Sequence, residues 1–195
     1  MKTLLYVFVL TTILPLKSIA QLDPAPNVAL SDLKFNSVFA YNKKDTLHSI
    51  CLLGTGFFKA KHSPNSNVMI KEWLATHPRA QVIPVTTYKS FTPRCPGAYQ
   101  SYCWIVDGRD TLNTYLIRNG CFEGHTMRRP HVRHEMTTLE KEMYGDIALH
   151  VGKPAYKTFL SSVKSAEAEA KKNRLGVWKM EKSRKKTKAS IKTTV

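Results

Sequence analysis

The densest group of side chains that could do chemistry lies between residues 125 and 135, which hold three histidines and three arginines. Of these residues, His131, His134 and Glu135 are of the types that ligate a hydrolytic metal ion. The arginines interspersed among them would repel a cation. Because the stretch has no apolar periodicity, we expect a solvent-exposed loop that suits an anion better than a metal, and we assign no metal ligands.

Basic side chains in loops, with aromatic residues nearby, form a second pattern. Cations can follow the phosphates of a single-stranded nucleic acid while aromatic rings stack on its bases. The candidate nucleic-acid-binding residues are Lys89, Arg94, Arg128, Arg129 and Arg133. The first two of them lie close in sequence to the rings of Tyr88, Phe91 and Tyr99. The alternative is that a basic protein simply displays basic residues on its surface.

The overall charge favours the same class of partner. The 195 residues include 30 Lys and Arg against 14 Asp and Glu, which gives a formal charge of +16 and a pI near 9.8. A surface of this kind attracts polyanions such as DNA or RNA. The hydrophobic share of 43% is that of a globular domain, and no apolar run is long enough to span a membrane.

The first twenty residues have the pattern of a secretory signal peptide. Lys2 precedes an apolar stretch at 4–16, and small residues at 18 and 20 suit cleavage before Gln21. The sequence therefore predicts export to the periplasm or the outside of the cell. An uncleaved anchor is the alternative, because Lys17 lies unusually close to the cleavage site.

The elements that must position these side chains follow from periodicity. We expect an extended leader at 21–32, a folded domain at 33–178 and a disordered basic tail at 179–195, where seven bases stand against one acid. Strands are predicted at 33–41, 46–53, 81–88 and 99–106, with Pro84 forcing an edge or a bulge. Helices are predicted at 68–77, from a cap at Asp110 or Thr111 to Gly120, at 137–149 and at 154–176. This order gives the α+β class.

All four cysteines lie in the part of the chain after the signal. They are Cys51, Cys95, Cys103 and Cys121, and in an exported protein they could pair in any of three connectivities. None forms a Cys-x-x-Cys pair, which argues against a zinc site. Since Cys51 and Cys103 sit in apolar strand-like runs, buried free thiols are the alternative.

Two stretches carry a resemblance to a known family. Residues 166–178 read AEAEAKKNRLGVW, and residues 102–120 read YCWIVDGRDTLNTYLIRNG. The first resembles the closing helix of the staphylococcal nuclease family, and the second resembles that family's last barrel strand, Asp-Gly turn and following helix. The order of elements extends the resemblance over 33–178. It implies a five-stranded oligonucleotide-binding (OB) barrel with about three to four helices.

The residues that would carry the family's chemistry are missing. Active members hydrolyse phosphodiesters with two arginines, a glutamate base and carboxylates that hold calcium. The matching run at 50–58 contains no Arg, Asp or Glu, and the second arginine would fall at Gln100. Family contacts beside it fall at Gly97 and Ala98. No catalytic residue is carried over, and calcium would be a cofactor only if the activity is retained.

Three hypotheses follow. The first is an exported nuclease-like domain that binds a polyanion without calcium-dependent hydrolysis. The second is an active phosphodiesterase with replacement residues, for which the candidates are Glu72, Asp107, His131, His134 and Glu135. The third is an envelope protein with a structural or partner-binding role. In all three, Trp178 is expected to pack with Leu175 and Val177 on the body of the fold, after a helix stop at Gly176.

Overall fold

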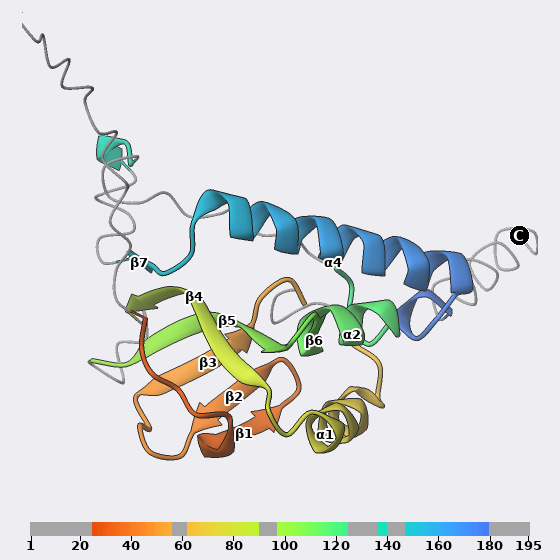
Figure 1. Ribbon diagram of the computed structural model, residues 1–195, viewed down its shortest axis with the longest axis horizontal. Helices are drawn as coiled ribbons and strands as arrows, with labels where there is room; N and C mark the ends of the chain where they lie inside the picture. Colours follow the sequence, from red (N-terminus) through yellow and green to blue (C-terminus); the bar gives the residue numbers. More distant parts are fainter. Residues whose placement is uncertain (1–24, 56–61, 90–96, 125–135, 140–146, 180–195) are drawn as a thin grey trace, which may run out of the picture.

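The computed structural model describes residues 25–55, 62–89, 97–124, 136–139 and 147–179 (Figure 1). The strands are β1 (Leu33–Asn36), β2 (Phe39–Asn42), β3 (His48–Leu52), β4 (Gln81–Lys89), β5 (Tyr99–Asp107), β6 (Asp110–Thr111) and β7 (Ile147–Leu149). The helices are α1 (Ser66–Thr76), α2 (Leu112–Arg118) and α4 (Lys153–Asn173), with a 3-10 helix at Leu30–Asp32. The predicted α+β class is confirmed.

The strands form one open, mixed sheet in the order β1-β2-β3-β5-β4-β7, and β6 pairs with β5. The pairing of β3 with β5 is parallel, and the other described pairings are antiparallel. The turn between β2 and β3 forms because the side chain of Asn42 accepts hydrogen bonds from the backbone N–H groups of Lys44 and Asp45, at 3.0 and 3.3 Å. The two antiparallel strands are therefore joined by a short polar turn that the Asn42 side chain holds in place.

Helix α4 runs across one face of the sheet and carries much of the core (Figure 1). Its apolar positions recur with helical period, and Tyr156, Phe159 and Val163 are buried against the sheet. The rings of Phe159 and Trp104 on β5 are 4.4 Å apart between centroids. No helix within the described ranges is long and apolar enough to cross a membrane.

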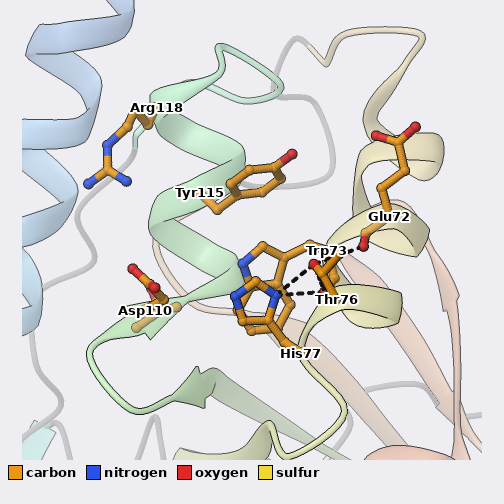
Figure 2. A pocket seen from close by; sticks show the side chains of 8 residues that line it. Glu72, Trp73, Thr76, His77, Asp110, Tyr115 and Arg118 are labelled. Atoms are coloured by element: carbon orange, nitrogen blue, oxygen red, sulfur yellow. Dashed lines mark hydrogen bonds between the residues drawn. The ribbon is translucent and has the colours of Figure 1, made fainter.

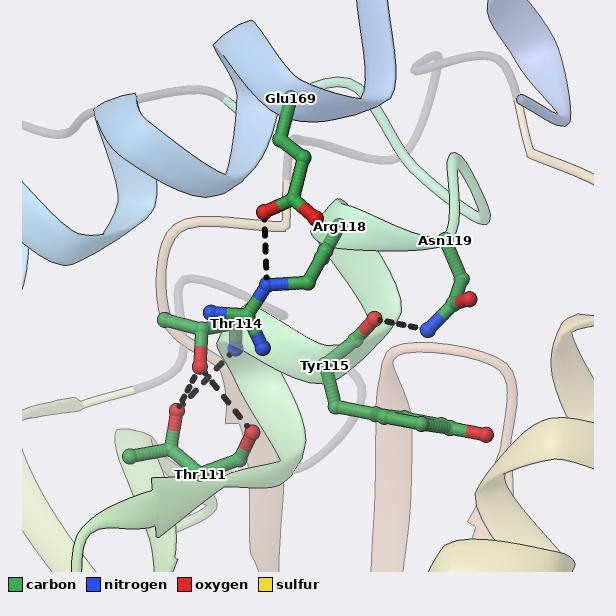
Figure 3. A network of polar contacts seen from close by, with 6 residues as sticks. All are labelled: Thr111, Thr114, Tyr115, Arg118, Asn119 and Glu169. Carbon is green, nitrogen blue, oxygen red and sulfur yellow. Dashed lines mark hydrogen bonds and ion pairs between the residues drawn. The ribbon is translucent and has the colours of Figure 1, made fainter. Parts of the chain in front are cut away.

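Helix α2 is fixed at both ends by polar contacts (Figure 3). The Thr111 hydroxyl accepts a hydrogen bond from the backbone N–H of Thr114 at 3.1 Å, so Thr111 is the N-cap. Near the other end, Nε of Arg118 donates to Glu169 of α4 at 3.1 Å. This ion pair is half-exposed and is therefore worth less than about 1 kcal/mol. It links the last turn of α2 to α4.

The loop after α2 and the turn after α4 lock together through two glycines. Gly120 and Gly176 both have positive φ, 67° and 47°, and their backbones touch so closely that a Cβ on either would collide with the other segment. The N–H of Val177 donates to the carbonyl of Gly120 at 2.9 Å. Val177 is buried, Trp178 is half-buried, and Leu175 is 36% exposed. The predicted packing therefore holds for Val177, holds in part for Trp178 and is wrong for Leu175.

Two predicted elements are wrong. The strand expected at 33–41 is split into β1 and β2, because Ser37 turns the chain with a positive φ of 61°. The helix expected to reach Leu149 does not do so, since Ile147–Leu149 is strand β7 and pairs with Thr86, Thr87 and Tyr88 of β4. The bulge expected at Pro84 is confirmed, because the β4–β5 register shifts between Pro84 and Thr86.

The cysteines in the described ranges are free thiols. Cys51, Cys103 and Cys121 are all buried and unpaired with one another. Any complete pairing of four cysteines needs at least one bond among these three, so none of the three connectivities is present. Burial raises the pKa of Cys51 to about 12 and that of Cys121 to about 11, which keeps both thiols protonated and unreactive.

Candidate functional site

The first candidate site is the start of β3 and β5, where the nuclease resemblance expects two arginines. The parallel register places Ser49 beside Gln100 and Ile50 beside Ser101. Side chains alternate between faces along a strand, so Ile50 and Gln100 project from opposite faces. Two groups that clasp one phosphate must project from the same face, which makes Ser49 the partner position of Gln100.

Neither position provides a cation. Ser49 and Gln100 are neutral, and the Ser49 hydroxyl lies 3.4 Å from the carbonyl oxygen of Tyr99. Ile50 is fully buried in an apolar cluster with Leu33, Ala40 and Cys103. A phosphate at this place would meet hydrogen-bond donors at most, without the charge that stabilises a phosphoryl transition state.

A chain of polar side chains crosses the sheet instead. Nε2 of His48 on β3 lies 2.8 Å from the hydroxyl of Ser101 on β5, and that hydroxyl lies 2.7 Å from the hydroxyl of Thr87 on β4. The Thr87 hydroxyl lies 3.0 Å from Nε2 of His150, just after β7. Four neighbouring segments are thus joined by side-chain hydrogen bonds on one face.

The His48 end of this chain is held by Tyr99 and Asp45. The rings of His48 and Tyr99 stack with centroids 4.2 Å apart, and the Tyr99 hydroxyl donates to the Asp45 carboxylate. This hydrogen bond raises the pKa of Tyr99 to about 12 and lowers the pKa of Asp45. The sequence pattern did not single out these residues as a group, because only the strand register brings them together.

A histidine beside a serine hydroxyl is the arrangement of an activated nucleophile, but access decides its chemistry. Ser101 is fully buried and His48 is 2% exposed, so no substrate reaches the pair. Buried polar side chains that satisfy one another instead fix a unique strand alignment. The chain of hydrogen bonds therefore acts in stability.

The pKa of His48 predicts a loss of stability in acid. Burial lowers that pKa below its usual value, with partial opposition from the nearby Asp45 charge. The unfolded chain then binds a proton below about pH 6.5 that the native state resists, so stability falls as pH drops through this range. We expect the melting temperature of the wild type to fall more steeply between about pH 7.5 and 5 than that of His48→Gln, which does not titrate. Parallel pH profiles in thermal melts would contradict this assignment.

A pocket of about 280 Å³ opens between α1 and α2 (Figure 2). Its lining residues are Glu72, Trp73, Thr76, His77, Asp110, Thr111, Tyr115 and Arg118. The rings of Trp73 and His77 stack at 4.0 Å, and His77 Nδ1 lies 2.8 Å from the Trp73 carbonyl. His77 is thus committed to capping the end of α1. In the described ranges, no three His, Cys, Asp or Glu side chains approach closely enough to hold a metal ion.

The structure places only part of the sequence-predicted site. Lys89 ends β4 and pairs with Tyr99 through the backbone. Glu72 lines the α1–α2 pocket, whereas Asp107 ends β5 and is not among the residues of that pocket. The remaining candidates lie outside the described residues: Arg94, Arg128, Arg129, His131, Arg133, His134 and Glu135.

Comparisons with known proteins add no identification. The sequence matches no model of a known protein family. No curated protein is similar to it at a significant level. The functional assignment therefore depends on the geometry and on the motifs in the chain itself.

Proposed function

We propose that this chain is an exported nuclease-like domain of the OB type that binds a polyanion and lacks calcium-dependent hydrolysis. The observation that carries the proposal is a contrast between two groups of residues in the nuclease resemblance. The motif residues Asn113, Gly120 and Gly176 make structural contacts in the fold, whereas the strand positions expected to hold the phosphate are neutral.

The retained motif residues support the nuclease-like fold. Asn113 is fully buried and hydrogen-bonds the backbone of both β5 and the chain just after β3, while Gly120 and Gly176 join the two motifs in direct contact. A parallel β3–β5 pair, with α1 on the connection from β3 to β4, is compatible with a Greek-key barrel.

The surface charge supports the choice of a polyanion. The formal charge is +16 for the full sequence and +14 once the signal at 1–20, with Lys2 and Lys17, is removed, and many of the described bases are exposed. Such a surface can hold a chain of phosphates, but the neutral residues Ser49 and Gln100 at the expected phosphate position cannot stabilise charge that develops at a reacting phosphorus. Retained binding with lost turnover is the expected result.

A nuclease assay tests the proposal. The full-length protein after signal removal is incubated with single-stranded DNA and with RNA, with calcium or with a chelator, while fluorescence anisotropy follows binding to the same oligonucleotides. We expect salt-sensitive binding and no cleavage. Cleavage that the chelator abolishes would refute the loss of hydrolysis. An absence of binding at low salt would refute the polyanion function and favour a structural role.

The basic tail gives a further prediction. Deleting residues 180–195 removes six bases and one acid, and we expect unchanged thermal stability with weaker binding to single-stranded DNA. The slope of log affinity against log salt should fall by at most about 4, since each contacted phosphate of a single strand contributes about 0.7. Titrations of both proteins across a salt series measure the slope. Equal affinities and equal slopes would mean that the tail touches nothing.

A further inference from the structure

Helix α4 carries a straight row of lysines on its outer flank. Lys157, Lys164 and Lys171 follow one another at intervals of seven residues, which is close to two helical turns, so they lie on one side of the helix. All three are exposed, whereas the opposite side of α4 packs on the sheet. At about 1.5 Å per residue the row is about 21 Å long.

The row is little neutralised by acids. Glu167 pairs with Lys171 at 2.9 Å, and Glu169 pairs with Arg118 of α2. No ion pair is found for Lys157 or Lys164 within the described part of the chain. A positive potential therefore extends along the helix. Bases that balance the helix dipole are needed only in the last turn, so the dipole does not account for the whole row of lysines.

The row ends at a basic pocket with apolar surface. Beyond Asn173 the chain turns back, and a pocket of about 630 Å³ is formed by Asn173, Arg174, Leu175, Gly176, Trp178 and Lys179. The Lys171 ammonium lies 4.4 Å from the centroid of the Trp178 ring, so the last lysine of the row meets the aromatic residue of the pocket. Arg174 and Lys179 of this pocket are exposed, and so is Lys172, the residue after the last lysine of the row.

We infer that the outer flank of α4 and the turn that follows it form a binding surface for single-stranded nucleic acid. The inference rests on the proposed polyanion function and gives it a location and a partner. The lysines follow the phosphates, and the Leu175 and Trp178 side chains offer apolar contact to a base at the end of the row. This α4 surface is separate from the strand positions to which the nuclease resemblance points.

The apolar end of the row favours a single strand over a duplex. Leu175 and Trp178 line the pocket at this end, and they can contact the face of a base only where that base is unstacked, as in a single strand. A flexible single strand can follow all of a straight row about 21 Å long.

The test is a triple variant with a charge-matched control. Lys157→Gln, Lys164→Gln and Lys172→Gln are combined, and Lys171 is kept because it contacts Glu167 and Trp178. Glutamine is about as good a helix former as lysine, so the fold is preserved. The control combines Lys34→Gln, Lys71→Gln and Arg79→Gln, which are exposed and lie on or near β1 and α1, away from α4 in Figure 1.

Affinity for a labelled oligo-thymidine and for a duplex of equal length is measured across a salt series. At about 0.15 M salt we expect the α4 variant to lose about tenfold or more in affinity for the single strand, and its salt slope to fall by about 2. At the same salt the control should lose less than about threefold, because charges beyond about 8 Å are screened there.

Each outcome separates the inference from the proposed function. Equal losses in the two variants, with tight wild-type binding, would overturn the α4 surface and leave polyanion binding in place. Tighter wild-type binding to the duplex would overturn the choice of a single strand. A wild type that binds neither oligonucleotide would overturn the proposed function itself.

Discussion

Replacing Gly176 with alanine is expected to lower the free energy of unfolding by about 3 kcal/mol, an effect far larger than one methyl group usually has. Gly176 has φ 47°, which costs a residue with a Cβ about 1–2 kcal/mol. The new Cβ would also collide with the backbone carbonyl of Gly120, which accepts a hydrogen bond from the Val177 N–H. Moving the two segments apart to relieve the collision would break that hydrogen bond, which adds about 1 kcal/mol. Urea unfolding followed by circular dichroism measures the change.

A second glycine separates strain from contact. Gly108 also has a positive φ, 60°, but a Cβ there would meet nothing within 4 Å. Gly108→Ala should therefore cost only the conformational strain, about 1–2 kcal/mol. Gly120→Ala should behave like Gly176→Ala, since its Cβ would collide with the backbone of Leu175. Similar losses for all three variants would mean that the two segments are not locked together.

These glycines mark the limit of prediction from the sequence. The helix stop before Gly120 and the left-handed conformation of this glycine follow from local rules, and the structure confirms them. The stop expected at Gly176 is wrong, because α4 ends at Asn173, although Gly176 also has a positive φ. That the two glycines touch each other is a tertiary contact between segments about fifty residues apart, and no local rule contains it. The chain even reverses after α4 at Arg174, a non-glycine residue with φ 53°.

The buried face of helix α4 was predictable because its burial repeats locally. Tyr156, Phe159, Val163, Ala166 and Ala170 of α4 are all buried as their 3.6-residue period indicates. Strand β7 was not predictable in this way. It has three residues and exists because it pairs with β4 beyond the Pro84 bulge, so its conformation is set by its partner rather than by its own sequence.

The polar chain across the sheet shows the same limit at the site. His48 stands in a strand with Ile50 and Leu52 on the same face, and this is a local sign that the histidine is buried. Its partner Ser101 could be found only from the β3–β5 register. The absence of arginine at the positions to which the nuclease resemblance points is easier to predict, because residue types are read from the sequence without any strand register.

Replacing Asn113 with leucine is expected to cost about 4 kcal/mol, although the two side chains are similar in size. Asn113 is fully buried, and its Oδ1 accepts the Ile105 N–H at 3.0 Å. Its Nδ2 donates to the carbonyls of Leu53 at 2.8 Å and Cys103 at 3.0 Å. Leucine would leave all three backbone groups buried, and each unsatisfied group costs about 1–3 kcal/mol. Urea unfolding of the wild type and the variant measures the loss.

Asn119→Ala is the matched control for this replacement. Asn119 is also at α2, is half-buried, and its Nδ2 donates to the Tyr115 carbonyl at 2.9 Å. Water can replace that single hydrogen bond, so the loss should stay near 1 kcal/mol. If Asn113→Leu were no more destabilising than Asn119→Ala, α2 would not be fastened to the ends of β3 and β5. The motif that carries much of the nuclease resemblance would then lack the structural role assigned to it, because Asn113 is its central polar residue.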